Sequence, residues 1–453
     1  MAACIDHEGL FVYSEKLKSA YPRSASGRRG IGVFTLGLGQ HHLRRLLWIV
    51  PQIHCVDPAS STRPSRTQQP AGSTRIAFLQ SPIYIPHQAL CGPHHLDTMP
   101  SPIKVAIVGY GLSAKVFHIP LILALPSSYT LHGIVQRSPK PSDDASKDHS
   151  NAKAYRSVDE VYTDKDVDLV VITSIPETHY EMCKKSLEAG KHVVVEKPFV
   201  PTSREAEELR QLAEKSGRKL AVYQNRRWDS DFLTLKKVIE EGTLGDLAEF
   251  ETHFDRHRPD PPPQTWKAED KPAHGSIYDL GTHLIDQIYT LFGLPERVTG
   301  FVGNQRRSVS GGAPDSHTVL LQYPHLLVTV KAGVVSPEEE QLRYWVRGTK
   351  GSFKKFHLDP QEDQLKATAQ GAPLPANFGV EEESHAATVT TVEGGRKRYA
   401  TVEPATYVEY YRLVAKAVRG EGEVPVKAEE ARDVLRIIEA ALVSSREGRS
   451  VTL

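Results

Sequence analysis

Cysteine, net charge and long apolar runs are all scarce in this sequence. Their scarcity counts against a metal or disulfide framework, a strongly charged partner and a membrane-spanning helix, respectively. Its four cysteines, among 453 residues, stand at no metal-ligand or disulfide-framework spacing, which predicts no metal site and fits a reducing, cytoplasmic compartment. The 56 Lys and Arg residues nearly balance the 55 Asp and Glu residues, so composition gives no electrostatic reason to expect nucleic acid or an anionic membrane as a partner. No apolar run approaches the roughly 18 residues that a membrane-spanning helix needs.

The first hundred residues lack sustained hydrophobic periodicity and are rich in Arg, Ser, Pro and His. Such a segment buries too little apolar surface to offset its chain entropy. We therefore expect residues 1–100 to be disordered, or to be an artefact of a gene model extended upstream of Met99. An organelle transit peptide is the third alternative, and the acidic residues Asp6 and Glu8 count against it.

A glycine turn follows the first apolar strand after that segment. In "IKVAIVGYGLSAKVF" (Ile103 to Phe117), Gly109, Gly111 and Ala114 match G-x-G-x-x-[G/A], with Leu112 inside the turn. The first glycine permits a tight turn, the second lets the backbone approach a pyrophosphate, and the third small residue permits close helix packing. A bare match is weak, but the strand before it and the helix after it favour a dinucleotide site.

The end of the next strand bears on the choice of cofactor. "TLHGIVQRS" (Thr130 to Ser138) ends where NAD-specific sites usually carry an acid for the ribose hydroxyls. This sequence has Arg137 and Ser138 there, and both could bind a 2′-phosphate that an acid would repel. We therefore favour NADP(H) over NAD(H); the alternative is that Arg137 is a solvated loop residue and either cofactor works.

Two further strands end in polar loops that belong to the same predicted site. Ser174 and Pro176 follow the strand "DLVVIT", and His179 begins the next helix, where it either faces the cofactor or merely occupies the first turn. Gln224 follows the strand "KLAVY". Strands that alternate with helices predict a doubly wound parallel sheet, which binds ligands beyond the carboxyl ends of its strands. These residues are therefore candidate cofactor contacts.

"HVVVEKPF" (His192 to Phe199) is a buried valine strand that ends in charge. Glu196 and Lys197 stand at its carboxyl end, where ligands of such a sheet bind, so we expect Lys197 to face the cofactor and substrate and Glu196 to brace the turn or the cofactor. Pro198 restricts Lys197 to an extended conformation. A cis Lys197–Pro198 bond is a further hypothesis.

The second half of the chain carries one helix with two titratable residues on a common face. In "GSIYDLGTHLIDQIYTLFG" (Gly275 to Gly293), apolar residues repeat at helical spacing, and Asp279 and His283 lie four apart on another face. An Asp beside a His can hold the ring and favour its cation, as a proton shuttle requires. The alternative is a helix-start acid and a surface histidine. The alternating segments that follow predict a largely antiparallel sheet with one open face.

The joint order of these motifs resembles the Gfo/Idh/MocA family of oxidoreductases, from about Ile103 to Leu453. "AGKHVVVEKPF" and "DLGTHLID" carry the resemblance, and "GYGLSAKVFHIP" and "YQNRRWDSDF" are most similar to the branch with NADP-dependent scyllo-inositol dehydrogenases. Two departures, "HGSIYD" and the pair Trp266-Lys267, bear on details of substrate and cofactor contact.

The resemblance implies a fold, a reaction and a set of roles. A Rossmann domain (residues 101–223) would precede an α/β substrate domain (224–453), whose open sheet often forms homo-oligomer contacts. In oxidation His283 would take the hydroxyl proton while hydride passes to the nicotinamide, Lys197 would stabilise the oxygen, and Asp279 would orient His283.

The remaining candidates concern the substrate. Arg226, Arg227 and Trp228 could hold hydroxyls or a carboxylate of a small-molecule substrate; the alternative is ion pairs and a packed indole at the domain seam. Trp266 is a candidate to close over the cofactor. We expect a dehydrogenase or reductase of a polyol, cyclitol, sugar or related carbonyl compound. A dinucleotide-bound regulator of the same fold is the rival, and the joint presence of Lys197, Asp279 and His283 favours the enzyme.

Overall fold

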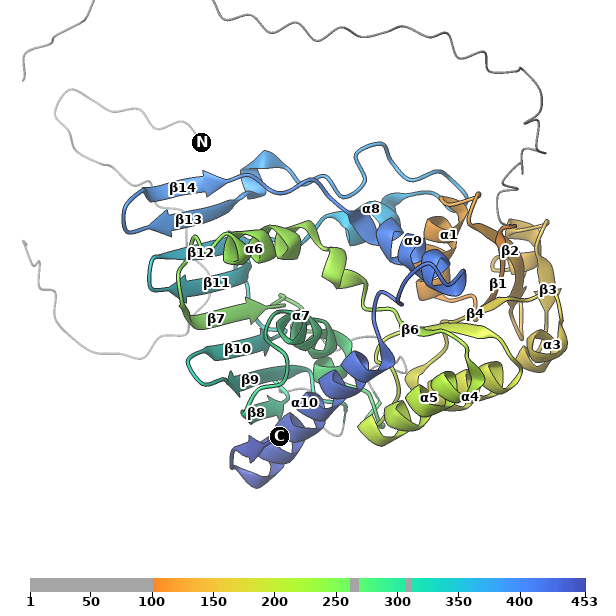
Figure 1. The fold of residues 1–453 in the computed structure, drawn as a ribbon, viewed down its shortest axis with the longest axis horizontal. Coiled ribbons are helices and arrows are strands. Elements are labelled where there is room, and N and C mark those ends of the chain that lie inside the picture. Colours follow the sequence, from red (N-terminus) through yellow and green to blue (C-terminus); the bar gives the residue numbers. More distant parts are fainter. Residues whose placement is uncertain (1–100, 261–268, 307–311) are drawn as a thin grey trace, which may run out of the picture. The chain divides into compact units, whose positions relative to one another are not determined.

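Two sheets organise the part of the chain that the computed structural model describes, which is residues 101–260, 269–306 and 312–453 (Figure 1). A six-stranded parallel sheet lies at the right of this view and a nine-stranded mixed sheet at the left. The arrangement is an α/β fold and confirms the predicted fold class. The predictions for residues 1–100 and for Trp266 lie outside the described residues, and the domain boundaries near residues 100 and 223 stay predictions.

The parallel sheet has the strand order β3-β2-β1-β4-β5-β6. Its strands are β1 (Ile103–Val108), β2 (Tyr129–Val135), β3 (Lys153–Tyr155), β4 (Leu169–Ile172), β5 (His192–Val195) and β6 (Leu220–Val222). The valines of β5 are buried, as is all of β4, because helices cover both faces of the sheet. This is the doubly wound sheet that the sequence predicts.

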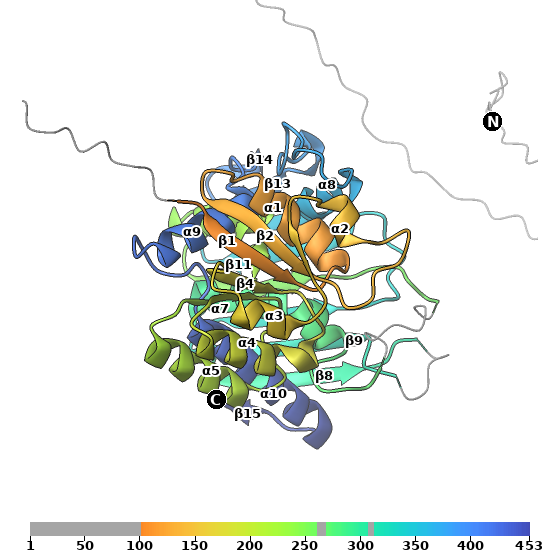
Figure 2. The same ribbon diagram turned by 90° about the vertical axis from the view of Figure 1, so that its right-hand side faces the viewer.

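Helices connect these strands and cover the sheet on both sides. They are η1 (Ala114–His118), α1 (Ile119–Leu123), α2 (Ala145–Asp148), α3 (Val158–Thr163), η2 (Pro176–Thr178), α4 (His179–Glu188) and α5 (Ser203–Ser216). Figures 1 and 2 show α3, α4 and α5 on one side and α1 on the other. The helix after the glycine turn contains a short stretch of π-helix, the π-turn η1, which the sequence did not predict.

The mixed sheet has the strand order β14-β13-β12-β11-β7-β10-β9-β8-β15. Its strands are β7 (Leu247–His253), β8 (Arg297–Gly303), β9 (Ser316–Gln322), β10 (Leu327–Ala332), β11 (Leu342–Gly348), β12 (Gly351–Phe356), β13 (Ala387–Thr391), β14 (Gly395–Tyr399) and β15 (Val451–Thr452). Among these strands, β7 and β10 pair in parallel and the other neighbours pair antiparallel. The largely antiparallel sheet is therefore confirmed.

Among the described residues, helices cover one face of the mixed sheet and none covers the other (Figure 1). The helical segments of this half are η3 (Asn225–Trp228), α6 (Ser230–Glu240), η5 (Ile277–Gly281), α7 (Thr282–Phe292), α8 (Gln361–Ala367), η6 (Glu383–His385), α9 (Thr406–Val418) and α10 (Ala428–Glu447). Along β10, Val328 and Val330 are buried while Thr329 and Lys331, on the other face, are partly exposed. α10 packs so closely on β8 that a Cβ at Gly300 would lie 2.3 Å from the Ala441 carbonyl oxygen.

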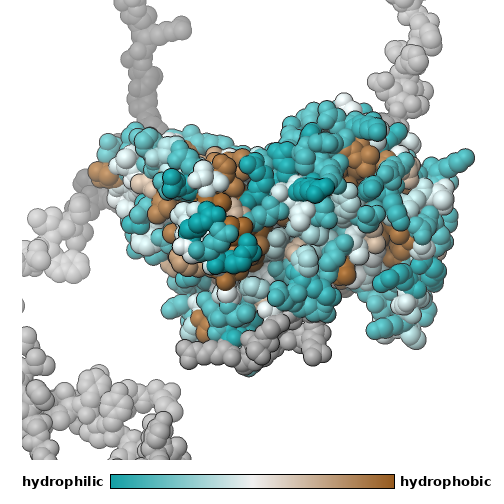
Figure 3. Space-filling model, turned by 90° about the horizontal axis from the view of Figure 1, so that it is seen from below, coloured by the Kyte–Doolittle hydropathy of each residue, from teal (hydrophilic) through white to brown (hydrophobic). Residues whose placement is uncertain are grey.

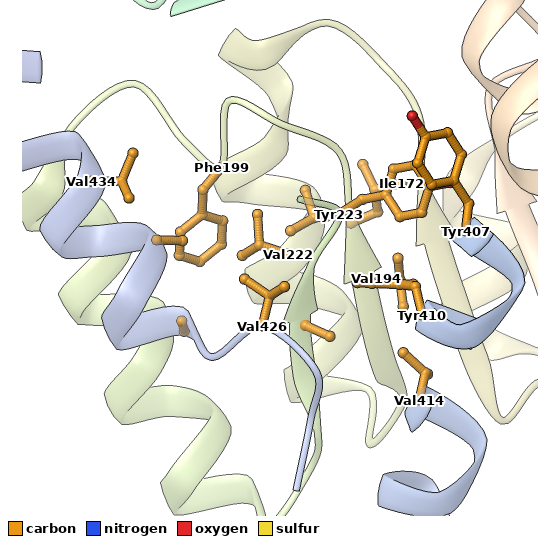
Figure 4. Close-up of a cluster of buried hydrophobic side chains, with 14 of the residues drawn as sticks. Ile172, Val194, Phe199, Val222, Tyr223, Tyr407, Tyr410, Val414, Val426 and Val434 are labelled. Carbon is orange, nitrogen blue, oxygen red and sulfur yellow. The ribbon is translucent and has the colours of Figure 1, made fainter. Parts of the chain in front are cut away.

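The C-terminal helices return to the parallel sheet and join the two halves. The Val222 amide donates to the Val426 carbonyl across 3.3 Å, beside an isolated bridge between Ala221 and Lys427. Figure 4 shows Tyr410 of α9 and Val434 of α10 in one buried apolar cluster with β5 and β6 side chains. The seam between the sheets is therefore a packed core, and it fixes the carboxyl ends of β5 and β6 relative to α7.

The surface seen from below is mostly hydrophilic, with hydrophobic residues in separate patches (Figure 3). Within the described ranges, no helix is both long enough and apolar enough to span a bilayer. The same residues contain no group of three or more His, Cys, Asp and Glu side chains placed to hold a metal ion.

Candidate active site

The glycine turn leaves space for a ligand at one glycine and none at the other. Gly109 has φ +104°, and a Cβ added there would lie 2.8 Å from Thr173 Oγ1, so only glycine fits. At Gly111 no heavy atom of a described residue lies within 4 Å of an added Cβ. Ala114 is fully buried and Leu112 is exposed. A backbone surface left open in this way suits the pyrophosphate of a dinucleotide.

Glu196 ties the glycine turn to the end of β5. Its carboxylate accepts hydrogen bonds from Ser113 Oγ, from His118 Nε2 at 3.0 Å and from the Lys197 amide at 2.9 Å. Burial opposes the charge of Glu196, but the hydrogen bond and charge of His118, with Lys197 and Ser113, lower its pKa to about 2. Glu196 therefore braces the turn, which is one of the two roles that the sequence analysis left open.

His118 is a member of this site that sequence reasoning missed. Its ring is fully buried, with Nδ1 2.5 Å from the hydroxyl of Tyr411 on α9 and its ring centroid 4.2 Å from that of Tyr223. The residues His118 and Tyr411 are 293 positions apart. No local pattern connects such a pair, so only the folded chain identifies the contact.

Lys197 emerges from the carboxyl end of β5 and pairs with Asp279. Its Nζ lies 2.9 Å from Asp279 Oδ1 and 2.8 Å from the Asp279 carbonyl oxygen. The Lys197–Pro198 peptide bond is cis, as hypothesised. Asp279 belongs to the π-turn η5, which precedes α7 directly. The turn brings a carboxylate and a carbonyl oxygen to the same ammonium.

His283 lies on the first turn of α7 in a buried position. Its pKa is well below the ordinary value, because burial, the charge of Lys197 and that of Arg226 oppose protonation more strongly than Asp279 favours it. Its Nδ1 has no hydrogen-bond partner among the described residues. The ring is thus neutral near pH 7. The predicted orienting role of Asp279 stays a prediction.

His179 stabilises two strand-end loops. It is buried, with Nδ1 3.0 Å from the Pro198 carbonyl oxygen and Nε2 3.1 Å from that of Ser174. Burial lowers its pKa despite these carbonyls. His179 is the first residue of α4, and its contact with the cofactor stays a prediction. Pro176 is buried in the same loop, and the Ser174 hydroxyl lies 2.6 Å from that of Thr178.

Gln224 connects the end of β6 to the helix that carries His283. Its Nε2 donates to Thr282 Oγ1 at 3.1 Å, and its side chain is almost completely buried. Its Oε1 has no partner within the described part of the chain. A cofactor contact of Gln224 stays a prediction.

The loop after β2 places Arg137 and Ser138 in solvent, which fits both a 2′-phosphate site and a solvated loop. A second cation stands beside them, because Arg156 Nη1 donates to the Gln136 carbonyl across 3.2 Å. The Gln136 side chain closes this loop by donating to the Asp143 carbonyl at 2.8 Å. Sequence reasoning missed Arg156, which follows β3 and carries no motif.

Arg226, Arg227 and Trp228 form the short helix η3 at the seam. Arg227 donates to both carboxylate oxygens of Asp286, at 2.8 and 2.7 Å, and to Glu430 at 2.8 Å. Arg226 donates to Asp229 at 3.3 Å and forms an ion pair with Glu362 of α8. The Trp228 ring stands edge-on to that of Tyr410, with centroids 5.7 Å apart. These are the ion pairs and the packed indole of the alternative interpretation.

A doubly wound sheet with an open glycine turn, and a lysine and a neutral histidine beyond its strand ends, define a dinucleotide-binding oxidoreductase. Residues 103–224 match the family model described as an oxidoreductase family NAD-binding Rossmann fold, and residues 236–453 match the model of the C-terminal alpha/beta domain of that family. The chain belongs to the Gfo/Idh/MocA family, which confirms the resemblance. It is an oxidoreductase with a nicotinamide cofactor and a small-molecule substrate.

Known proteins similar to this chain include two named dehydrogenases. The scyllo-inositol 2-dehydrogenase (NADP(+)) IolW of Bacillus subtilis is 37% identical over 366 residues, which are 80% of this chain and 98% of that protein. The trans-1,2-dihydrobenzene-1,2-diol dehydrogenase of Bos taurus is 30% identical over 288 residues, 62% of this chain and 82% of that one. The solved structure of the oxidoreductase YvaA from Bacillus subtilis covers 78% of this chain and 99% of its own, with 37% identity and a TM-score of 0.71.

Proposed function

We propose that this protein transfers hydride between NADP(H) and a polyol, cyclitol, sugar or related carbonyl substrate. The observation that carries the proposal is the Lys197–Asp279 pair beside the neutral His283, beyond the carboxyl end of β5. A cation and a proton acceptor together are what a carbinol needs as it loses hydride. The activities in the names of the inositol and dihydrodiol dehydrogenases support the substrate class.

The chain's own residues account for the proton and the charge. His283 is neutral, so its ring can take the proton of a substrate hydroxyl. Lys197 Nζ donates to the same oxygen and stabilises its developing negative charge. Asp279 holds that ammonium in place through two oxygens. A bound nicotinamide accepts the hydride in oxidation and supplies it in reduction.

The turn at Gly109 and Gly111 would hold the pyrophosphate, and Arg137, Ser138 and Arg156 would hold a 2′-phosphate. Two guanidinium groups beside one exposed hydroxyl favour NADP(H), because an anion with nearly two charges gains most from paired arginines. The name of the NADP-dependent inositol dehydrogenase supports this preference. A cytoplasmic location stays a prediction from the sequence.

The open face of the mixed sheet would form the contact of a homo-oligomer. Phe301 and Leu327 are 62% and 43% exposed there, on β8 and β10. A sheet face covered on one side only leaves apolar surface that a second copy can bury. Sedimentation of wild type and Phe301→Asp tests this contact: a dimer or tetramer that dissociates in the variant is expected, and a monomeric wild type would contradict it.

The test of function is a screen of the purified full chain for NADPH- and NADH-linked turnover across sugars, inositols, diols and small carbonyl compounds. We expect turnover with NADP(H), and a loss of at least about 100-fold in kcat for both Lys197→Met and His283→Ala. Full rates in both variants would refute the mechanism. Dinucleotide binding without turnover of any compound would favour the regulator.

A further inference from the structure

Arg256 extends the active-site cluster from the side of the mixed sheet. It follows β7, and its backbone continues beside the segment after β10: its amide donates to the Gly333 carbonyl at 2.9 Å, and its carbonyl accepts from Ser336 at 3.0 Å. Phe254, two residues earlier, faces the covered side, where its ring centroid lies 4.9 Å from the Arg226 guanidinium carbon. Because side chains alternate along an extended strand, Arg256 shares that side.

Both cations and carboxylates act on Arg256. Burial and the charge of Arg258 lower its pKa, while Asp279 and Glu362 interact with it favourably and Arg226 unfavourably. Glu362 is already shared, because it pairs with Arg226 and with Lys366. The charged groups that act on Arg256 are two cations, Arg258 and Arg226, and two carboxylates, Asp279 and Glu362, and each of these carboxylates already has a cation as its partner.

Arg256 also differs from the other arginines of the seam in its pairing. Arg226 and Arg227 each donate to two carboxylates, and Arg343 donates to Asp231 at 2.9 Å. The Arg256 guanidinium forms no ion pair or side-chain hydrogen bond with any residue in the described ranges. A half-buried guanidinium has lost part of its hydration. An anion that binds there accepts the hydrogen bonds that the guanidinium no longer donates to water.

We propose that Arg256, beside Arg226, binds an anionic group of the substrate while Lys197 and His283 act on a hydroxyl or carbonyl of the same molecule. This rests on the proposed function and narrows its substrate to hydroxylated acids or phosphate esters, such as sugar acids and sugar phosphates. The planar guanidinium fork binds two oxygens of a carboxylate or a phosphate at once. Uncharged inositols and sugars lack that group.

The test compares matched neutral and anionic probes on the NADP⁺-loaded full chain by isothermal titration. Glucose, galactose and mannose are each used as the free sugar, the uronate and the 6-phosphate. For at least one sugar, the uronate or the phosphate should bind about 10- to 100-fold more tightly than the neutral form, as one or two charge-assisted hydrogen bonds give. Which of the two binds identifies the group as carboxylate or phosphate.

Two variants complete the experiment. Arg256→Ala should reduce the affinity for the anion to that of the neutral sugar while the Kd of NADPH stays unchanged, and Arg256→Lys should restore part of the difference. Arg204→Ala is the matched control, because this residue of α5 is 88% exposed and its loss also removes one positive charge. The comparison of neutral and anionic probes uses the wild-type protein, so its result does not depend on whether a variant folds.

Three results would overturn the inference: equal binding of neutral and anionic forms, an anion preference that survives Arg256→Ala, and no binding by any anionic probe. The two proposals fail separately. Turnover of neutral compounds without a preference for anions leaves the proposed function intact and removes the anion subsite. Anion binding that depends on Arg256, without turnover of any compound, supports the anion subsite and contradicts the proposed function.

Discussion

Lys197 meets Asp279 at two oxygens, one on the carboxylate at 2.9 Å and one on the backbone at 2.8 Å. Asp279→Asn keeps one side-chain oxygen and the backbone carbonyl oxygen, and it removes the negative charge. We expect kcat to fall about 10- to 100-fold, since the salt bridge becomes a neutral hydrogen bond.

The pH profile of the same variant separates this role from a purely structural one. Asp279 raises the pKa of His283, against burial, which lowers it. Its neutralisation should therefore lower that pKa further, and the acid limb of the oxidation rate should move to lower pH. The measurement is kcat against pH for wild type and variant; a limb that moves to higher pH would contradict the assignment of His283 as base.

Arg137→Ala should change the cofactor preference. The exposed guanidinium would lose its contact with the 2′-phosphate, so kcat/KM for NADPH should fall about 10- to 100-fold while that for NADH is unchanged. Lys140→Ala is the control, because Lys140 is exposed in the same loop. An NADPH preference equal to that of wild type would leave Arg137 as a solvated loop residue.

Glu196→Gln should weaken dinucleotide binding through its effect on the glycine turn rather than through a direct contact with the dinucleotide. Glu196 holds Ser113 of the glycine turn and His118 on one carboxylate, so the neutral amide leaves one of these donors poorly paired. We expect the Kd of NADPH, measured by fluorescence, to rise about 10-fold, and unfolding to become easier by about 1–3 kcal/mol. Glu208→Gln, on the exposed surface of α5, should leave the Kd of NADPH and the free energy of unfolding unchanged.

Arg227→Leu distinguishes a seam ion pair from a substrate contact. The variant leaves the almost fully buried Asp286 without its bidentate partner, which costs about 3–5 kcal/mol in such pairs. Urea unfolding should show that loss, while the substrate KM of the folded enzyme stays within about twofold. A variant of normal stability with a strongly raised KM would instead make Arg227 a substrate ligand.

His317 gives the protein an acid-sensitive stability. Burial lowers its pKa to about 4, whereas an unfolded histidine titrates near 6.5. Above pH 6.5 the ring is neutral in both states; between 6.5 and 4 only the unfolded chain takes up the proton, so stability falls by up to about 3 kcal/mol as the pH falls. His317→Gln should flatten the curve of unfolding free energy against pH in that window. Parallel curves would refute this account.

Local patterns were sufficient for most of the framework and for the centre of the site. The valine run that ends in Lys197, the glycine turn and the helical stripe around His283 each carry their structure in neighbouring residues, so the fold class could be predicted and is confirmed. The π-turns η1 and η5 could not, because their geometry depends on what packs against them. Arg256 lies in a charged stretch that has the composition of a loop.

Contacts across the seam were beyond sequence reasoning for another reason. The partners of Arg227 lie 59 and 203 positions away, on α7 and α10, and several acids of equal charge could have served. Pairing at such separation is decided by the packing of helices rather than by any periodicity. The sequence could therefore state both alternatives for Arg227 and Trp228 without choosing between them.

The apolar cluster of Figure 4 also sets the order in which the enzyme can mature during translation. β6 leaves the ribosome well before Tyr410 and Val426, which cover it. A nascent chain that has completed all six parallel strands still exposes Val222 and Tyr223 to water. The core that fixes the carboxyl end of β6 is therefore complete only after α9 and α10 have left the ribosome.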